Sequence, residues 1–506
     1  MLTELLTNLI RVKVLRVLFF YIGTPSPILE TELELIKIHE QAGDKVRVLQ
    51  CSGALPNCHW NIKHIDSKCA MCRSKFKSGW DVLNPSDNVE LKQFERQPKY
   101  NDIDLQEPFD SIKDITNFEY DGEGIGYGTT ATMVSVERDH RLDTHKLHED
   151  IVRTLTSSIH IYNSLKIEMK NFCPDRVYFF NGRIHTHLPA KLLCKKLGID
   201  FYSYEVSYNK NSYVLINNKT VHDPISSERV AQIDGTWTSK KQELGDSILQ
   251  NMRNRVTGKL PTFANKQKPI LPDGFDIAKR NIAIFAGTLD EYEGIQFGTN
   301  KIYKPDQTAG MAEILRALEF HPEFFFYLRV HPHMKDLPHT NSQLADIKSI
   351  STQFSNVCVI WPEDPVDTYR LIDACEKIVT FGSTTGVEAT FWGRPSILAD
   401  YSAFQNFDYA YKPASHSELI DLLHADIPAL SKNVASKVMF SVVYDHHIKY
   451  KFFKEEGIQN NLAFGAFDGV RLKSSRFSTL WFWCYNPLPR LIRVIKNPNV
   501  LLKKIW

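Results

Sequence analysis

Residues 377–400 read KIVTFGSTTGVEATFWGRPSILAD. The apolar run before Gly382 predicts a buried strand, the segment TGVEATFW predicts a short helix, and RPSILAD predicts a further strand. The hydroxyl side chains of Ser383, Thr384 and Thr385 therefore fall where a strand ends and a helix begins. Unpaired backbone N–H groups and the positive end of the helix dipole lie at such a place, so the turn is suited to binding an anion.

The residues around this turn extend the same interpretation. Gly382 and Gly386 would let the backbone approach a phosphate, and Glu388, one helical turn further on, would accept hydrogen bonds from a ribose diol. Upstream, FFFYLRVHP predicts a strand whose end carries Arg329 and His331, two side chains that suit phosphate oxygens. The alternatives are a simple helix cap for the hydroxyls and a solvated histidine at a strand exit.

The whole chain repeats this strand–turn–helix rhythm in two halves. With 506 residues and 43% hydrophobic content it is too long for a single core, and we expect an α/β protein with two Rossmann-like lobes facing a cleft. A cysteine-rich insert and a helical, basic C-terminal tail complete the expected fold. The expected boundaries are 1–240 for the first lobe with the insert at 51–72, 241–278 for a linker, 279–430 for the second lobe and 431–506 for the tail.

Composition and charge exclude several classes of protein. The formal net charge of +2 gives no indication of nucleic-acid binding, and no secretory signal or apolar run of about 20 residues is present. Nine cysteines, an odd number scattered over a long chain, are not typical of a disulfide framework. We therefore expect a soluble protein made in a reducing, cytoplasmic compartment.

The tail carries a separate signal. After Asp468 the charges are all basic, and they are interleaved with aromatic and leucine residues, as in RFSTLWFWCYNPLPRLIRVIKNPNVLLKKIW. This pattern favours the surface of an anionic membrane, which would place the protein peripherally on the inner face of the cytoplasmic membrane. A tail that packs back across both lobes is the alternative.

The segments LRVHP and TFGSTTGVEATFWGRPSIL resemble the carboxyl-terminal half of GT-B-fold glycosyltransferases of bacterial capsule and surface-polysaccharide synthesis. CSGALPNCHWNIKHIDSKCAMC, YDGEGIGYG and FNGRIHTHLPAKLLCKKLGIDFYSYE resemble a subgroup of the same enzymes, so the likeness covers most of residues 10–430. It implies transfer of a sugar from a nucleotide-sugar donor to a glycan or lipid-linked glycan acceptor.

The resemblance also assigns roles within the second lobe. His331 and the turn Ser383–Thr385 would hold the donor phosphates, Arg329 would support them and Glu388 would bind the ribose. The family often has a second serine where Thr384 stands; the hydroxyl is retained. Because dipole and cationic groups would neutralise the diphosphate, no catalytic metal is expected.

Weaker candidates complete the predicted site. Asn181 and Arg183 follow the strand VYFF, and Glu205, at the end of IDFYSYE, is the first candidate for a general base, with His185 and His187 behind it. A structural carboxylate paired with Arg183 is the alternative for Glu205. In the second half, Gly287 and Thr288 follow the first strand and would line the phosphate site, with Asp290 and Glu291 near the acceptor. A plain acidic loop is the alternative for Asp290 and Glu291.

Four cysteines lie within a short window: Cys51, Cys58, Cys69 and Cys72. Such a group suits a structural zinc site in a segment that has little core of its own, with His59 and His64 as substitute ligands. Free buried thiols are the alternative, and a thioredoxin-like redox pair is disfavoured because this C-x-x-C does not open a helix after a strand.

Three other functions share this scaffold. A nucleotide-sugar epimerase of the UDP-GlcNAc 2-epimerase kind would have a similar Ser-Gly-x-x-Glu turn. A catalytically silent scaffold subunit of a polysaccharide synthesis complex would bind nucleotide or partner without turnover. A polyol-phosphate transferase is the third. The nucleotide, the sugar and the linkage stay open.

Overall fold

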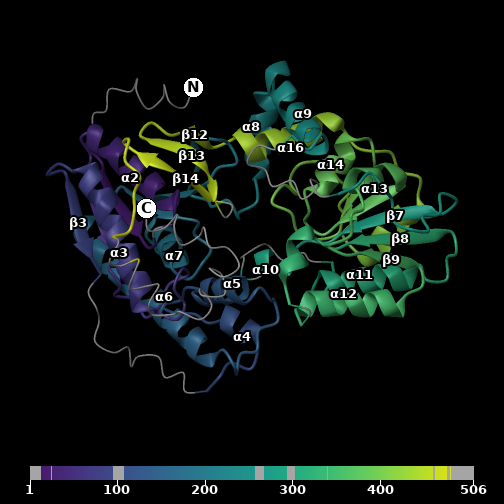
Figure 1. Cartoon of the computed structure of the whole chain (residues 1–506), viewed down its shortest axis with the longest axis horizontal. Coiled ribbons are helices and arrows are strands. Elements are labelled where there is room, and N and C mark those ends of the chain that lie inside the picture. The colour runs from purple at the N-terminus through teal and green to yellow at the C-terminus, as the bar shows by residue number, and fades with distance from the viewer. Residues whose placement is uncertain are drawn as a thin grey trace.

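The computed structural model describes residues 13–23, 25–94, 107–256, 267–292, 294, 302–338, 340–459, 462–475 and 479. These residues form two α/β lobes that lie side by side, with the N-terminal half of the chain in one and residues from about 280 to 425 in the other (Figure 1). The predicted pair of Rossmann-like lobes is confirmed. Among the described residues, no helix is both long and apolar enough to cross a bilayer.

The N-terminal lobe is built on a seven-stranded sheet of order β12-β6-β5-β4-β1-β2-β3. The first five of its strands in the chain are parallel. At one edge β6 pairs antiparallel with β5, and β12 pairs antiparallel with β6. The strands are β1 (Arg16–Tyr21), β2 (Lys45–Gln50), β3 (Val89–Gln93), β4 (Arg176–Phe180), β5 (Asp200–Val206), β6 (Ser212–Asn217) and β12 (His447–Lys449). The strand order reverses between β1 and β4, and ligands of such sheets bind outside the carboxyl ends at this point.

Helices cover both faces of this sheet. Alternate residues of β1 enter different cores, Leu18 and Phe20 in one and Val17, Phe19 and Tyr21 in the other. This burial on both faces explains why the strand is apolar throughout. The helices are α2 (Ile28–Gln41), α3 (Asp66–Leu83), α4 (Ile112–Thr116), α5 (Gly126–Glu137), α6 (His148–Phe172) and α7 (Leu188–Leu197).

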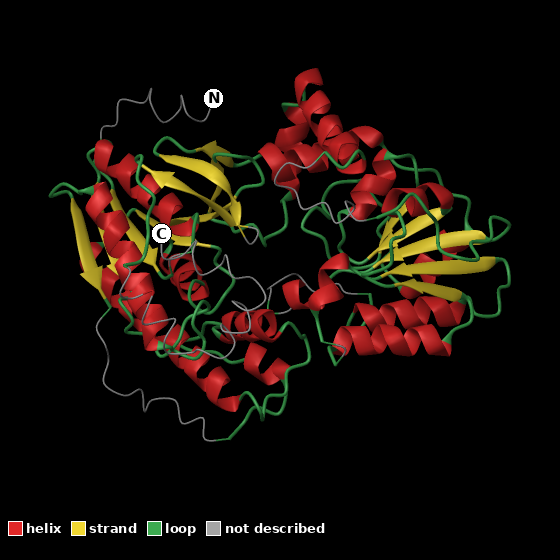
Figure 2. Ribbon diagram, in the orientation of Figure 1, coloured by secondary structure: helices red, strands yellow, loops and turns green. Residues whose placement is uncertain are grey.

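The second lobe has a five-stranded parallel sheet of order β11-β10-β7-β8-β9, with helices on both faces (Figure 2). Its strands are β7 (Arg280–Phe285), β8 (Phe324–Arg329), β9 (Val357–Ile360), β10 (Lys377–Thr380) and β11 (Ser396–Leu398). Its helices are α10 (Leu289–Tyr292), α11 (Gln307–Ala317), the 3-10 helix η2 (Pro332–Asp336), α12 (Ser342–Gln353), α13 (Thr368–Ala374), α14 (Thr385–Phe391) and α15 (His416–His424).

The connection between the lobes differs from the expected linker at 241–278. Residues up to Arg253 belong to α9 (Ser239–Arg253), whose Ile248 and Leu249 are buried in one cluster with Val387 of α14. α8 (Ser227–Gly235) and α16 (Lys432–Tyr444) join the same cluster, so the first lobe ends soon after β6. The apolar spacing of α9 produces this packing, and residues 257–266 lie outside the described part.

The expected helical tail is also corrected. After α16 the chain returns to the first lobe, where β12 pairs with β6 and the hairpin of β13 (Phe453–Gln459) and β14 (Leu462–Phe467) contacts α2. The buried carboxylate of Glu34 causes this anchoring, because it accepts the backbone N–H groups of Lys451, Phe452 and Phe453 at 2.6, 2.8 and 3.1 Å. The basic and aromatic tail at 476–478 and 480–506 lies outside the described residues, so its membrane role stays a prediction.

A second buried carboxylate, that of Glu32, makes stability depend on pH. Glu32 is 2% exposed, Tyr204 donates to its Oε2 at 2.8 Å, and burial raises its pKa from 4.5 to about 8. Between these values the folded protein holds a proton that the unfolded chain releases, so stability is lost as pH rises. We expect this group to lower the free energy of unfolding by up to about 1.4 kcal/mol per pH unit in that window.

Urea denaturation between pH 6 and pH 9 measures this slope. Glu32→Gln is expected to flatten it, because the amide has no proton to lose, whereas Glu119→Gln at an exposed position is expected to leave it unchanged. An equal slope in the Glu32→Gln variant and the parent chain would contradict the assignment.

Candidate active site between the two lobes

The structure brings the predicted donor-binding residues to one edge of the second sheet. β10, β7 and β8 are neighbouring parallel strands, with Thr380 level with Phe285 and Phe285 level with Arg329. The turns that follow them carry Ser383–Thr385, Gly287–Thr288 and His331. The strand ends that carry the outer two turns are thus two strand spacings apart, about 9.6 Å.

The hydroxyl turn itself has the predicted strand–turn–helix geometry. Gly382 has φ +80°, in the left-handed region, and α14 begins at Thr385. The backbone N–H of Thr385 donates to Ser383 Oγ at 3.2 Å, and this hydroxyl donates to Thr385 Oγ1 at 3.0 Å. The side chains of Ser383 and Thr384 are half-buried, which leaves part of each at the surface of the edge.

Gly386 has a packing role in the structure. A Cβ at this position would lie 2.8 Å from Ser396 Oγ and 3.0 Å from Thr380 Oγ1. The glycine is therefore needed for close packing of α14 on β10 and β11, and its approach to a phosphate stays a prediction.

Glu388 is held inside the lobe. It is 6% exposed, and its carboxylate accepts hydrogen bonds from the Tyr369 hydroxyl at 2.5 Å and from Thr384 Oγ1 at 3.4 Å. Burial raises the pKa of this carboxyl. A ribose diol would have to compete with Tyr369 for it, so the predicted ribose contact requires a rearrangement of that pair.

Arg329 and His331 lie at the end of β8 in different environments. Arg329 is 3% exposed, donates to the Val366 carbonyl at 3.2 Å and thereby holds the loop after β9. His331 is half-buried, burial lowers its pKa, and its Nδ1 accepts the backbone N–H of His333 at 3.2 Å. In the neutral ring the proton must then be on Nε2, which makes His331 a hydrogen-bond donor.

Across the cleft, Glu205 ends β5 of the first lobe. Its Oε2 accepts a hydrogen bond from Asn181 Nδ2 at 2.9 Å, and its Oε1 accepts the backbone N–H of Val206 at 3.0 Å. Burial raises the pKa of this carboxyl, while the charge of Arg183 and the two hydrogen bonds act in the opposite direction. A carboxylate with a raised pKa that is fixed by two donors suits a general base.

Arg183 joins the two lobes. It follows β4, and its guanidinium donates to the carbonyl of Glu291 in the second lobe at 2.9 Å and to Ser135 Oγ at 3.1 Å. Its backbone N–H donates to Asn181 Oδ1 at 3.0 Å. Because Glu291 follows β7, this contact shows that the carboxyl edges of the two parallel sheets face each other.

His185 does not belong to the acceptor side. It is fully buried, its Nδ1 and Thr132 Oγ1 are hydrogen-bonded at 2.9 Å, and its backbone N–H donates to the same hydroxyl at 3.0 Å. His187 is also buried, against the rings of Phe20 and Phe180. Burial contradicts both predicted roles, since Thr132 of α5, far away in sequence, holds His185 in the core and the two phenylalanine rings enclose His187.

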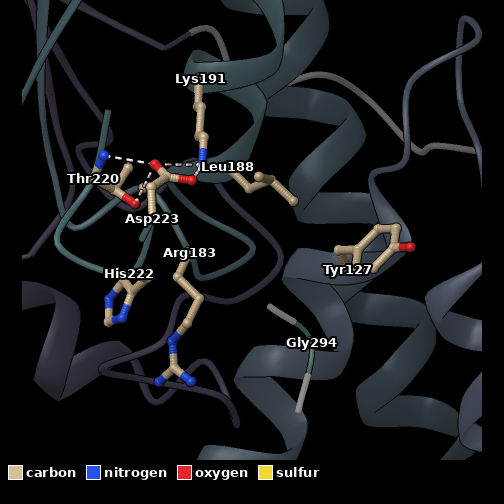
Figure 3. Close-up of a pocket in the computed structure, with 9 residues that line it drawn as sticks. Tyr127, Arg183, Leu188, Lys191, Thr220, His222, Asp223 and Gly294 are labelled. Carbon is tan, nitrogen blue, oxygen red and sulfur yellow. Dashed lines mark hydrogen bonds and ion pairs between the residues drawn. The ribbon is translucent and has the colours of Figure 1, made fainter. Parts of the chain in front are cut away.

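The sequence analysis missed a polar recess beside Arg183, which Figure 3 shows. Asp223 accepts hydrogen bonds from Lys191 Nζ at 3.1 Å and from Thr220, while His222 Nε2 lies 2.9 Å from Asn181 Nδ2. Burial lowers the pKa of His222 to about 3, so this ring is neutral. The residues that line the recess are Tyr127, Gly182, Arg183, Leu188, Lys191, Thr220, His222, Asp223 and Gly294.

The recess lies between the lobes, because Gly294 comes from the second one. The sequence NNKTVHDP, which begins at the last residue of β6, carries the signal for this recess. The sequence pattern does not indicate β6, an antiparallel strand near the sheet edge, and therefore does not predict that His222 and Asp223 lie at the cleft.

Further contacts fix the lobes relative to each other. Arg138 pairs with Asp290, and Ser342 donates its backbone N–H to Asp139 Oδ2 at 2.8 Å. Asp290 thus serves an interlobe ion pair, and the acidic loop after β7 is a structural contact of the two lobes.

One cluster of possible metal ligands lies in the same interface. Ligand atoms of His140, Asp306 and Asp346 lie within 4.8 Å of one another. Arg141 donates to Asp306 Oδ2 at 3.0 Å and to Asp346 Oδ2 at 2.6 Å. The guanidinium already supplies the positive charge between these carboxylates, so the cluster is an ion-pair network.

No family model and no curated protein matches this sequence. Solved structures do show likenesses. The beta Kdo 2,4 transferase KpsC of Thermosulfurimonas dismutans is 13% identical, with 58% of this chain and 84% of that chain covered and a TM-score of 0.35. The UDP-GlcNAc 2-epimerase of Neisseria meningitidis bound to UDP-GlcNAc is 13% identical, with 84% and 98% covered and a TM-score of 0.29. The spinosyn rhamnosyltransferase SpnG is 12% identical, with 84% and 95% covered and a TM-score of 0.23.

Structural likenesses with such low sequence identities and TM-scores give no information about the activity of this chain. The fold class follows from its own topology: two Rossmann-like lobes whose sheets turn their carboxyl edges toward each other form a GT-B-like fold.

Proposed function

We propose that this protein transfers a sugar from a nucleotide-activated donor to a carbohydrate acceptor. One observation carries the proposal. Arg183, at the carboxyl edge of the first sheet, bonds to Glu291 at the carboxyl edge of the second, with Glu205 on one side and His331 on the other. A base in one lobe and a set of phosphate-binding groups in the other are the two requirements of sugar transfer from a nucleoside diphosphate.

The second lobe would bind the leaving group. The diphosphate would lie between His331 and the turn at Ser383, where the Nε2–H group of His331, the hydroxyls and the backbone N–H groups neutralise the charge that develops on it. These donors are already in place, so the scheme requires no divalent metal.

The first lobe would activate the acceptor. Glu205 would take the proton of the attacking hydroxyl while the bond from the sugar carbon to the phosphate oxygen breaks and a bond to the acceptor oxygen forms. The polar recess with Arg183, Lys191 and His222 would hold neighbouring acceptor groups. The sequence motifs favour surface polysaccharide as the acceptor, and the basic tail favours work at an anionic membrane.

A panel of nucleotides tests this function. Thermal-shift measurements with UDP, CMP, CDP and GDP are expected to identify one nucleotide that raises the melting temperature. The matching nucleotide sugars are then incubated with glycan acceptors, with and without a chelator, and products are analysed by mass spectrometry.

We expect an acceptor-dependent glycan product that the chelator leaves unchanged. A donor converted to its epimer without acceptor would identify an epimerase instead. Transfer of a polyol phosphate would identify the polyol-phosphate transferase. Nucleotide binding without any turnover would identify a silent scaffold subunit, and each of these three results would overturn the proposal.

A further inference from the structure

We propose that Cys51, Cys58, Cys69 and Cys72 together hold a thiolate-bound metal centre that fixes the cysteine loop, residues 51–65, beside the cleft. The proposal is independent of the sugar transfer proposed above. None of the four side chains is part of a disulfide, and all four are half-buried.

The fold brings these cysteines together from three segments. Cys51 follows β2, Cys58 lies in the loop, and Cys69 and Cys72 lie in the first turns of α3. A Cβ on Gly53 would lie 3.6 Å from Cys69 Cβ, so the turn after Cys51 packs directly on α3. The C-x-x-C pair thus lies at the start of a helix that follows the cysteine loop rather than a strand.

Asn61 links Cys58 and Cys69. Its side-chain amide donates to Cys69 Sγ at 3.3 Å, and its backbone N–H donates to the Cys58 carbonyl at 2.8 Å. Cys51, Cys69 and Cys72 all lie close enough to Cys58 to interact with it electrostatically. Cys58 is therefore central to the group.

One hydrogen-bond donor points at a sulfur atom of the group, because the side-chain amide of Asn61 donates to Cys69 Sγ. A protonated thiol is a weak acceptor that gains little from such a donor, whereas a metal-bound thiolate is stabilised by it.

The spacing of the sulfurs restricts how a metal is held. Among the described residues, no three of these sulfurs lie within 4.8 Å of one another. Zinc with Zn–S bonds of about 2.3 Å needs sulfurs about 3.8 Å apart, so zinc would draw the loop and the start of α3 inward. An iron–sulfur cluster is also held by four thiolates and is wider. Zinc and an iron–sulfur cluster would both be bound by the thiolates of the four cysteines.

The metal centre would matter because the cysteine loop lies near Arg183. Residues 51–65 contain no helix and no strand longer than an isolated bridge, so the loop has little core of its own. Asn57 anchors it to Thr154 and Ser157 of α6, and His59 lies near Arg183. A metal that orders this loop would therefore order the surroundings of Arg183.

Elemental analysis of the full chain, purified without oxygen, tests the proposal. We expect about one zinc per chain, or iron with a matching amount of acid-labile sulfide; the two results distinguish the metals. Cys58→Ser is expected to lose the metal and to melt at a lower temperature. Cys173→Ser is the matched control, because Cys173 is exposed at the end of α6, and it is expected to keep the metal.

If Cys58→Ser does not fold, a mercurial reagent added to the parent chain replaces it as the test. Metal release is then expected as the half-buried thiols are modified, after the exposed Cys173 has reacted without releasing metal. A parent chain with less than about 0.1 metal per chain after growth with added zinc and iron would overturn the proposal. Retention of the metal by a folded Cys58→Ser variant would do the same.

Discussion

Glu205→Gln is expected to lower kcat for sugar transfer by about 10²- to 10⁴-fold, the usual contribution of a general base. The amide keeps the size of the side chain but has no lone pair of sufficient basicity to take the acceptor proton. Its hydrogen bond from Asn181 is retained by the amide carbonyl, so donor binding and folding should change little. Initial rates at saturating donor and acceptor measure the effect.

The pH profile gives an independent check on Glu205. Because burial raises its pKa, the basic form is lost at a higher pH than for an ordinary glutamate, and the rate should fall as pH decreases through that raised value. This acid limb should disappear in the residual activity of Glu205→Gln. The exposed control Glu119→Gln should match the parent chain. A Glu205→Gln variant with more than about half of the parent rate would exclude Glu205 as the base.

His331→Ala is expected to lower kcat by about 10²- to 10³-fold, the cost of removing one preorganised donor from a developing negative charge. The ring is neutral and its Nδ1 is occupied by the His333 backbone, so the Nε2–H group is the donor that the variant loses. Titration calorimetry should also show weaker binding of the nucleoside diphosphate, with little change for the nucleoside alone.

His333→Ala is the matched control for this variant. The imidazole of His333 is 43% exposed, and the backbone N–H that fixes the tautomer of His331 stays in place. Its effect should be well below that of His331→Ala. Equal losses in the two variants would show that the segment acts through its fold rather than through the ring of His331.

The sequence predicted the second lobe well because its determinants are local. The strand before Gly382, the hydroxyl turn and the helix to Phe391 lie within a few residues of each other, and each has a distinct period or turn residue. The neighbours β7 and β8 follow from the same alternation of strand and helix.

Contacts between segments that are distant in the chain explain where the predictions from the sequence differ from the structure. β12 has three residues, and its pairing with β6 joins segments more than 200 positions apart, so no local pattern indicated it. The sequence makes His185 a candidate base, whereas its burial depends on Thr132 of α5, 53 positions earlier in the chain. Gly386 looked like a phosphate-loop glycine, and only the positions of Thr380 and Ser396 show its packing role.

A crystal structure of the chain with its preferred nucleoside diphosphate tests the central claim most directly. We predict a diphosphate lying along the carboxyl edge of the second sheet, hydrogen-bonded to His331 Nε2 and to the turn at Ser383, with Glu205 facing it from the other lobe. A diphosphate bound away from both His331 and Ser383 would contradict the claim.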